Sequence, residues 1–376
     1  MSVPEDGDLG FVVHVSPKTA GESGAFGTRA AVAGDGLMGV TDARSRPGGE
    51  TDLSLGRIIC AMSLELSDKR VLVTGGAGLV GSHLAAHLSE DNHVVVADDL
   101  SKGARERVPD GVEFVQADMT DPDDVAEAVT EDLDIVFHFA AYTDTNYGNP
   151  RQLFEENTEM TYNVLERMQE VGVSDIAFTS SSTIYGEAPR PTPEDYAPLE
   201  PISIYGSSKL ADEGLLSTFA HSYDFTVYMY RFANIVGPNQ RGNVIPDFIE
   251  KLLEDPETLE ILGDGRQEKS YLHVEDCIDA MCHVVEHADR DYNVYNLGTR
   301  TTTSVTTIAN IVADVLDLDP EFEYTGGDRG WTGDVPKMRL SIEKLSALGW
   351  EPDGSSDEAV RRAAEELTAE LRAEYE

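Results

Sequence analysis

A tyrosine and a lysine stand four positions apart in the segment IYGSSK, as Tyr205 and Lys209. On a helix this spacing places the two side chains on one face, one turn apart. A free phenol titrates at about pH 10, which is too high for a general base at neutral pH. A neighbouring ammonium favours the phenolate and brings the pKa of the phenol closer to the working range. An isolated pair of this kind is usually only a solvated helix pair, so its meaning depends on the residues around it.

The residues upstream of this pair are rich in hydroxyl groups. The segment SSSTIYG, residues 180–186, ends a predicted strand, and Pro201 precedes the predicted helix that carries the tyrosine. A serine hydroxyl at this strand end can hydrogen-bond the same substrate oxygen as the phenolate and stabilise charge while the proton moves. Together these residues indicate acid–base chemistry on a substrate oxygen.

A glycine-rich loop, TGGAGLVG at 74–81, lies near the start of the ordered pattern. Gly75, Gly78 and Gly81 stand between a predicted strand at 70–75 and a predicted helix at 82–91. Such glycines let the backbone turn tightly and approach a pyrophosphate, whose charge meets the N–H groups at the helix start. Many glycine patterns only make turns, but the strand and helix on either side favour a dinucleotide site.

An acidic residue follows this loop at the distance that such a site requires. Asp98 ends the second predicted strand, at 93–99, seventeen positions after Gly81. A carboxylate there accepts hydrogen bonds from the adenosine ribose hydroxyls and repels a 2′-phosphate. No arginine stands immediately beside it, so the sequence predicts NAD rather than NADP. A solvated strand-end acid is the alternative if the residue is considered without the loop.

Strand and helix patterns alternate from Lys69 onward, which indicates a Rossmann-type, doubly wound parallel sheet. After about residue 235 the pattern loosens, which predicts a smaller C-terminal α/β substrate-binding domain. The predicted strands are 70–75, 93–99, 112–118, 134–141, 174–182 and 225–234, and the predicted helices are 82–91, 121–130 and 150–172. The predicted division is an NAD-binding domain at 62–235 with 271–295 returning to it, and a substrate-binding domain at 236–270 and 296–376.

The first 61 residues differ from the rest in composition. They are rich in Gly, Ser, Thr and Ala and show neither a helical nor a strand period, whereas Met62 stands a few residues before the first predicted strand. We expect residues 1–61 to be a disordered extension or the product of a misplaced translation start.

The composition restricts the partners. The formal net charge is −42, with 70 acidic residues against 28 basic ones, of which only 8 are lysines. Such a surface repels nucleic-acid phosphates. Solubility is one explanation of the acidity, and the scarcity of lysine favours another, adaptation to high salt. No apolar run approaches the roughly 20 residues of a membrane helix, and no signal pattern is present, so we expect a cytoplasmic protein. The three cysteines form no CxxC pair, so no metal site is predicted.

The motifs and their order resemble those of the extended short-chain dehydrogenase/reductases, within the NAD-dependent sugar-nucleotide epimerase/dehydratase family. The similarity runs from about Lys69 to Pro352. The segments that carry it include TGGAGLVGSH, VVVADDLSKG, QADMTD, FHFAA, SSSTIYG, YGSSK, RFANIVGPNQR, LGDGRQEKSYLHVEDC and YNLGTRTTTSV.

The resemblance implies roles for individual residues. The catalytic set that it implies is Ser181, Tyr205 and Lys209. The implied cofactor contacts are Gly75, Gly78, Leu79, Val80, Gly81, Asp98, Asp118, Met119, Phe139, Ala140, Ala141, Asn157, Tyr205 and Lys209. The implied substrate contacts are Ser181, Ser182, Thr183, Tyr205, Asn234, Arg241, Val244, Lys269 and Arg329.

By the same resemblance the substrate is a nucleoside-diphosphate sugar. The C4 hydroxyl would lose its proton to Tyr205 with help from Ser181, while a hydride leaves C4 for tightly bound NAD. The resulting 4-keto sugar would turn in the site and receive the hydride on its other face. The implied reaction is therefore epimerisation at C4 of a hexose of the UDP-glucose/UDP-galactose type, without net redox change.

The sequence departs from the family pattern at the positions that define dehydratases. The family's 4,6-dehydratases carry Asp-Glu directly after the residue that matches Ser181, where this chain has Ser182 and Thr183. Hydroxyls cannot replace those carboxyls as acid and base at neutral pH, which disfavours dehydration.

Two further departures concern the diphosphate. Lys269 and Trp331 stand where the family often has arginines, and lysine does not replace the arginine fork without cost. Arg241 and Arg329 are the candidate substitutes, although Arg329 could equally be a solvated loop residue and Trp331 a core anchor. Met160 replaces a common family glycine, which affects packing more than chemistry.

Three classes of function are compatible with these residues. The first is the C4 epimerase. The second keeps the same first oxidation but ends as another epimerase, a reductase, a decarboxylase or a 4,6-dehydratase. The third is a non-catalytic NAD-binding sensor, which the presence of all three catalytic residues disfavours. Family members are commonly homodimers, and the helix at 150–172 is a candidate interface. Its apolar residues could equally be core: Leu153, Met160, Val164, Leu165 and Met168.

Overall fold

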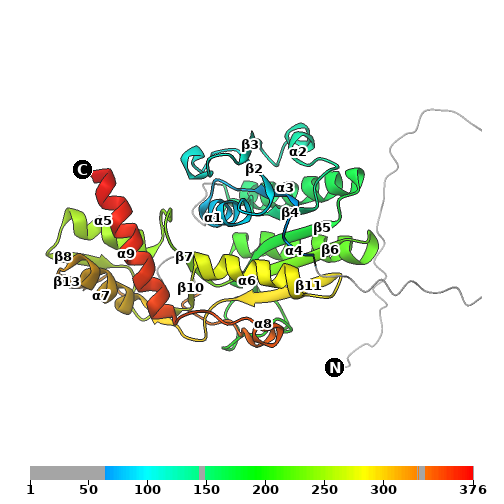
Figure 1. Ribbon diagram of the computed structural model, residues 1–376. Helices are drawn as coiled ribbons and strands as arrows, with labels where there is room; N and C mark the ends of the chain where they lie inside the picture. The colour runs from blue at the N-terminus through cyan, green and yellow to red at the C-terminus, as the bar shows by residue number, and fades with distance from the viewer. Residues whose placement is uncertain (1–63, 144–148, 328, 330–334, 376) are drawn as a thin grey trace, which may run out of the picture. The chain divides into compact units, whose positions relative to one another are not determined.

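The computed structural model describes residues 64–143, 149–327, 329 and 335–375 (Figure 1). The prediction for residues 1–61 lies outside this range. Within the described residues, no helix combines the length and the apolar character needed to cross a membrane.

A seven-stranded parallel sheet forms the centre of the described chain. Its strand order is β11-β6-β5-β4-β1-β2-β3, so the chain changes direction between β1 and β4. This order is that of a Rossmann sheet, and ligands bind such sheets at the carboxyl ends of the strands near the change of direction. The predicted fold class is confirmed. The strands are β1 (Arg70–Thr74), β2 (His93–Asp98), β3 (Glu113–Gln116), β4 (Ile135–His138), β5 (Asp175–Ser181), β6 (Thr226–Phe232) and β11 (Tyr292–Leu297).

Helices cover both faces of this sheet because alternate strand residues point to opposite sides. On β1, Val71 and Val73 belong to the core beneath α1 (Leu79–Leu88) and α6 (Val274–His287). Leu72 belongs to the core on the other face, beneath α2 (Pro122–Ala128), α3 (Pro150–Val171) and α4 (Ile204–Ser222).

The glycine loop is shorter than predicted. Helix α1 begins at Leu79, three residues earlier than expected, and extended Gly78 is its N-cap. Gly81 therefore lies inside the first turn of the helix. Its neighbour there is Gly75, and a Cβ on Gly81 would lie 2.4 Å from the Gly75 carbonyl oxygen. Only glycine at this position allows the helix to start so close to the strand.

The C-terminal part is more regular than predicted. A separate core unites α5 (Val244–Glu254), α7 (Val305–Leu316) and α9 (Ser356–Tyr375) with β8 (Thr258–Ile261), which pairs with β13 (Glu321–Tyr324). Figure 1 shows these elements gathered together. The expectation of loosely ordered pieces was wrong, because amphipathic helices lie between the Pro- and Gly-containing turns. The smaller elements are β7 (Asn234–Val236) with β10 (Tyr271–His273), β12 (Thr303–Ser304), β9 (Glu268–Lys269), β14 (Lys337–Met338), α8 (Glu343–Leu348), η1 (Arg105–Arg107) and η2 (Ser182–Tyr185).

The apolar residues of α3 belong to the interior of the chain. Leu153, Met160, Val164, Leu165 and Met168 are all buried. Of the two alternatives for these residues, a core role is the one observed. The exposed face of the same helix carries Phe154 and Tyr162, which are 36% and 44% exposed.

A buried ion pair fastens α4 to the sheet. Arg231 on β6 donates from Nε and Nη2 to the two carboxylate oxygens of Glu213 on α4, at 2.9 and 2.7 Å. Ser180 on β5 donates to the same carboxylate at 2.6 Å. A bidentate pair fixes orientation as well as distance. Glu213 therefore holds the helix that carries Tyr205 against the strand that carries Ser181.

The remaining donors of Arg231 extend this network. Its Nη1 donates to the Tyr185 hydroxyl at 2.7 Å and to the Glu194 carbonyl oxygen at 2.8 Å. Tyr185 in turn donates to Asn296 Oδ1 at 2.9 Å. Three strands, α4, η2 and the segment around Glu194 thus share one hydrogen-bonded group of buried side chains.

We predict that Glu213→Gln lowers the free energy of unfolding by about 3–5 kcal/mol, because it leaves the Arg231 charge buried without a counter-charge. Urea unfolding followed by circular dichroism measures this loss. The control is Glu155→Gln, which breaks the exposed Arg151–Glu155 pair on α3 and costs less than about 1 kcal/mol. Equal losses in the two variants would contradict the role given to the buried pair.

A buried histidine lies beneath the same region. His138 Nδ1 lies 2.7 Å from the Thr74 hydroxyl, and Nε2 lies 3.4 Å from the Thr161 hydroxyl. Burial, and to a smaller extent the charge of Lys209, lowers the pKa of His138 to about 3. The imidazole is therefore neutral at physiological pH and connects β1, β4 and α3.

This neutral histidine makes stability depend on pH. An unfolded histidine titrates at about pH 6.5, so below that pH the unfolded chain binds a proton that the folded chain does not. We predict that between pH 6.5 and 5 the wild type loses about 2 kcal/mol more unfolding free energy than His138→Gln. Urea unfolding at the two pH values tests this, and identical losses would contradict it.

Candidate active site

The structure brings the three predicted catalytic residues together at the carboxyl ends of the strands. Ser181 ends β5, and Tyr205 and Lys209 lie in the first two turns of α4, which Ser203 caps by accepting from the Gly206 amide at 3.0 Å. The start of α4 lies directly against η2, because a Cβ on Gly206 would lie 2.9 Å from the Thr183 carbonyl oxygen, and Ser181 lowers the pKa of the neighbouring Tyr205 phenol. Tyr205 and Lys209 thus lie on one helix, four positions apart, as the sequence spacing predicts.

The hydroxyls next to Ser181 are also organised around it. The Thr183 amide and Thr183 Oγ1 both donate to Ser181 Oγ, at 3.2 and 3.0 Å. Ser182 is buried in the single turn of η2. These contacts fix the Ser181 side chain where it meets the phenol.

The electrostatics of the tyrosine differ from the simple expectation. Burial raises the pKa of Tyr205 above its ordinary value, the charge of Asp212 raises it further, and the bond to Ser181 lowers it. Burial also lowers the pKa of Lys209, whose side chain is 2% exposed. The phenol therefore needs additional positive charge beside it before it can ionise near neutral pH.

The glycine loop lies directly against the end of β4. Gly75 has φ +65°, and a Cβ there would lie 2.7 Å from the Ala140 amide nitrogen. A side chain on Gly75 would collide with this segment. The amides of Phe139 and Ala140 donate to Thr74 Oγ1, at 3.2 and 3.3 Å. Ala141 follows in the same segment. The first turn of α1, which contains Leu79 and Val80, has neither an acidic residue nor a side-chain cap.

The two predicted acidic contacts are held in place by backbone amides. The Asp98 carboxylate at the end of β2 accepts from the amides of Ala77 and Leu100, at 2.9 and 2.8 Å. Burial raises the pKa of Asp98 despite these bonds. The Asp118 carboxylate accepts from the Thr120 amide at 2.8 Å, and Met119 beside it is buried. Both lie past the carboxyl ends of neighbouring strands.

Asn157 has a structural position. Its Oδ1 accepts from the Tyr142 amide at 2.8 Å, and its Nδ2 donates to the Tyr142 carbonyl oxygen at 3.0 Å and to Ser208 Oγ at 3.1 Å. The side chain thus connects the segment after β4 to α4, next to Lys209.

The predicted substrate residues come from the smaller elements. Asn234 begins β7, Val244 begins α5 and Lys269 lies in β9. Both candidate arginines contact carboxylates: Arg241 forms an ion pair with Glu370 at 2.8 Å, and Arg329 forms one with Glu187. Trp331 lies outside the described residues.

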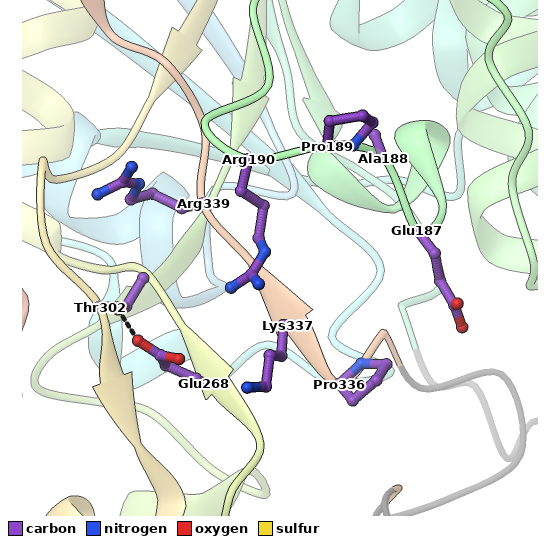
Figure 2. A pocket seen from close by; sticks show the side chains of 9 residues that line it. All are labelled: Glu187, Ala188, Pro189, Arg190, Glu268, Thr302, Pro336, Lys337 and Arg339. Atoms are coloured by element: carbon purple, nitrogen blue, oxygen red, sulfur yellow. Dashed lines mark hydrogen bonds between the residues drawn. The ribbon is translucent and has the colours of Figure 1, made fainter.

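A cavity of about 700 Å³ adjoins the segment that follows η2. Figure 2 shows Arg190 and Lys337 pointing into the same space as Glu268, whose carboxylate accepts a hydrogen bond from Thr302. Ser181, Tyr205 and Lys209, the predicted catalytic residues, are not among the described residues that line it. Its lining residues are Glu187, Ala188, Pro189, Arg190, Glu268, Thr302, Pro336, Lys337 and Arg339.

The sequence analysis missed two acidic residues of the site. Asp212 and Glu213 follow Lys209 by three and four positions on α4, which places both near it. This spacing was the available signal. The partner of Glu213 could not be read from it, because Arg231 comes from another element.

Comparison with known proteins identifies the family of this chain. The model of the NAD dependent epimerase/dehydratase family matches residues 71–298. UDP-glucose 4-epimerase of Mycolicibacterium smegmatis is 31% identical over 311 residues, covering 79% of this chain and 97% of the relative. The dTDP-D-glucose 4,6-dehydratase of Mus musculus is 30% identical over 317 residues, covering 79% and 88%.

Solved structures of related enzymes share the fold. A UDP-galactose 4-epimerase is 41% identical with a TM-score of 0.74, covering 80% of this chain and 99% of that one. The Thermotoga maritima UDP-glucose 4-epimerase with UDP-glucose is 31% identical with a TM-score of 0.75, covering 80% and 99%. The Thermus thermophilus UDP-glucose 4-epimerase with NAD is 32% identical with a TM-score of 0.72, covering 79% and 98%. Together with the glycine loop, the family match and these relatives show that this chain is an enzyme of the extended short-chain dehydrogenase/reductase type that uses NAD, and that it belongs to the NAD-dependent epimerase/dehydratase family.

Proposed function

We propose that the protein epimerises C4 of a nucleoside-diphosphate hexose of the UDP-glucose/UDP-galactose type through a 4-keto intermediate. The observation that carries the proposal is that the start of α4, with Tyr205 and buried Lys209 one helical turn apart, packs against the turn that follows Ser181 at the end of β5. A phenol and a hydroxyl that meet at one point can both contact a single substrate oxygen.

The residues around the glycine loop fit NAD. Gly75 and Gly81 leave space that a Cβ would fill, and the uncapped start of α1 presents amides suited to a pyrophosphate. Asp98 is fixed by two amides in a position to accept the ribose hydroxyls. Asp118 and Met119 would lie at the adenine, and residues 139–141 along the inner face. When bound, NAD supplies the acceptance and return of a hydride.

The chain's own residues would handle the proton and the orientation. Tyr205 would remove the proton of the C4 hydroxyl and later return it, and Ser181 would hydrogen-bond the same oxygen. Lys209 would supply positive charge beside the Tyr205 phenol. Without such charge, burial of the phenol keeps it protonated. The nucleotide would be bound by Asn234, Val244, Lys269, Arg241 and Arg329. The charge of each arginine would then be shared between the nucleotide and its carboxylate partner, Glu370 for Arg241 and Glu187 for Arg329.

Dehydration is the second candidate because one relative is a dTDP-D-glucose 4,6-dehydratase. The residues after Ser181 favour epimerisation instead. Ser182 is buried and Thr183 donates to Ser181, so neither offers a carboxyl for removal of the C5 proton and protonation of the C6 hydroxyl.

The proposal includes the setting in which the enzyme works. We propose a cytoplasmic homodimer adapted to high salt, with Phe154 and Tyr162 on the exposed face of α3 as part of the interface. Its net charge of −42 supports the adaptation to salt.

The direct test is incubation of the purified protein with UDP-glucose in concentrated KCl, with the sugar anomeric protons followed by NMR and no NAD added. We expect signals of UDP-galactose, which would also show that NAD remains bound during purification. If only UDP-N-acetylglucosamine is converted, the proposed reaction stays and the proposed substrate changes to an N-acetylated sugar nucleotide. Absence of any product even with added NAD would refute the proposal.

Tyr205→Phe is expected to lower kcat by about 10²–10⁴-fold, because it removes the acid–base group and keeps the ring. Binding of NAD, measured by fluorescence titration, should stay close to that of the wild type. The matched control is Tyr223→Phe, at the exposed end of α4, which should leave kcat unchanged. Wild-type turnover by Tyr205→Phe would contradict the assignment of the base.

A further inference from the structure

Among the residues that the structure describes, one carboxylate lies within ion-pair distance of Lys209. Its Nζ lies 4.0 Å from Asp212 Oδ2. The ammonium also makes a cation–π contact with the Phe178 ring, whose centroid is 4.5 Å from Nζ. The two side chains of the ion pair are 2% and 0% exposed. Burial of an ammonium to this degree is costly unless a partner balances the charge.

Asp212 is equally dependent on Lys209. Neither of its carboxylate oxygens has a hydrogen-bond partner among the described residues. Thr161 faces it from α3, but the Thr161 hydroxyl donates to the Asn157 carbonyl oxygen at 3.2 Å. Burial raises the pKa of Asp212 to about 7 although Lys209 lowers it. A buried carboxylate without hydrogen bonds is therefore an anion only beside a cation.

The other titratable groups near the pair are already occupied. Glu213, the next residue on α4, gives both oxygens to Arg231. His138 on β4 is neutral and bonded to Thr74. Tyr205, one turn before Lys209, is protonated in this state because burial raises its pKa. Within the described chain, Asp212 is therefore the carboxylate whose charge remains to balance Lys209.

Asp212 acts on Lys209 and Tyr205 in opposite senses. Burial lowers the pKa of Lys209, Asp212 and after it Glu213 raise it, and Asp212 also raises the pKa of Tyr205. Asp212 is 4.0 Å from the lysine nitrogen, whereas it stands seven positions after Tyr205 on the helix, about 10 Å along the axis. The nearer effect is the stronger one, since Coulomb energy falls with distance.

We propose that Asp212 is a positioning residue of the reaction, whose carboxylate keeps Lys209 protonated and in place beside Tyr205. The inference rests on the proposed function for its role in turnover. The ion pair itself can be measured without turnover.

The test is NMR titration of the protein labelled with [ζ-¹⁵N]lysine, which contains only 8 lysines. The Lys209 signal is assigned by its loss in Lys209→Arg. In Asp212→Asn the midpoint of the Lys209 titration should fall by about 1–3 pH units relative to the wild type. The alkaline limb of kcat against pH should move down with it, and Asp212→Glu should restore both.

The control is Asp175→Asn, at the start of β5, because burial likewise raises the pKa of Asp175 and the residue lies at the opposite end of the strand from Ser181. It should leave the Lys209 titration unchanged. An unchanged midpoint in Asp212→Asn would overturn the inference even if the wild type epimerises sugars. A shifted midpoint in a protein that converts no sugar nucleotide would support the ion pair and refute the proposed function. If Asp212→Asn does not fold, Asp212→Ser replaces it, with the same two outcomes.

Discussion

The Arg231–Glu213 pair is the interaction on which the geometry of the site depends. The chain has to place a helix and a strand end from different parts of the fold within hydrogen-bond distance, and neither element alone determines that distance. The bidentate bonds at 2.9 and 2.7 Å set the position of α4 against β6, and the Ser180 bond to Glu213 adds β5 to the same unit. A pair of this kind gives more orientation than net stability, because the cost of burying both charges offsets much of their attraction.

The same burial that makes the site precise also sets its chemistry. Tyr205, Lys209 and His138 all have pKa values shifted by burial toward their neutral forms. A buried site disfavours every isolated charge, so a phenolate forms only where positive charge is concentrated. The carboxylate of Asp212 and the positively charged nicotinamide of a bound cofactor would act on that balance from two sides. The pKa of Tyr205 therefore depends on the whole site, including Lys209, Asp212 and the bound cofactor.

Much of the fold was predictable because it follows from short-range patterns. Apolar strand runs, the glycine loop and the Asp121-Pro122 helix start each depend on residues close in sequence. The start of α1 was predicted three residues too late because Gly81 looks like a loop residue, although it lies in the first turn of the helix. Glycine is needed there because the helix packs closely against the Gly75 backbone. The regular C-terminal core was missed because Pro and Gly turns interrupt helices that only packing makes evident.

The site was predictable in its members and less so in its contacts. The position of Tyr205 and Lys209 on one helix follows from their spacing, and the position of Ser181 at the end of a strand follows from the alternation of strands and helices. The bonds of Asn157 to Tyr142 and Ser208 could not be predicted, since these residues are 15 and 51 positions away in sequence. The carboxylate partners of Arg241 and Arg329 come from residues more than one hundred positions away in sequence, which no local pattern indicates.

The most direct test of the central claim is the fate of the hydrogen at C4. UDP-[4-²H]glucose would be converted in water and the product examined by mass spectrometry and NMR. Epimerisation through oxidation and reduction at C4 within one site predicts UDP-galactose that retains deuterium at C4 and gains no solvent hydrogen at C5. Loss of the C4 deuterium to water, or exchange at C5 with loss of the C6 oxygen, would contradict the account.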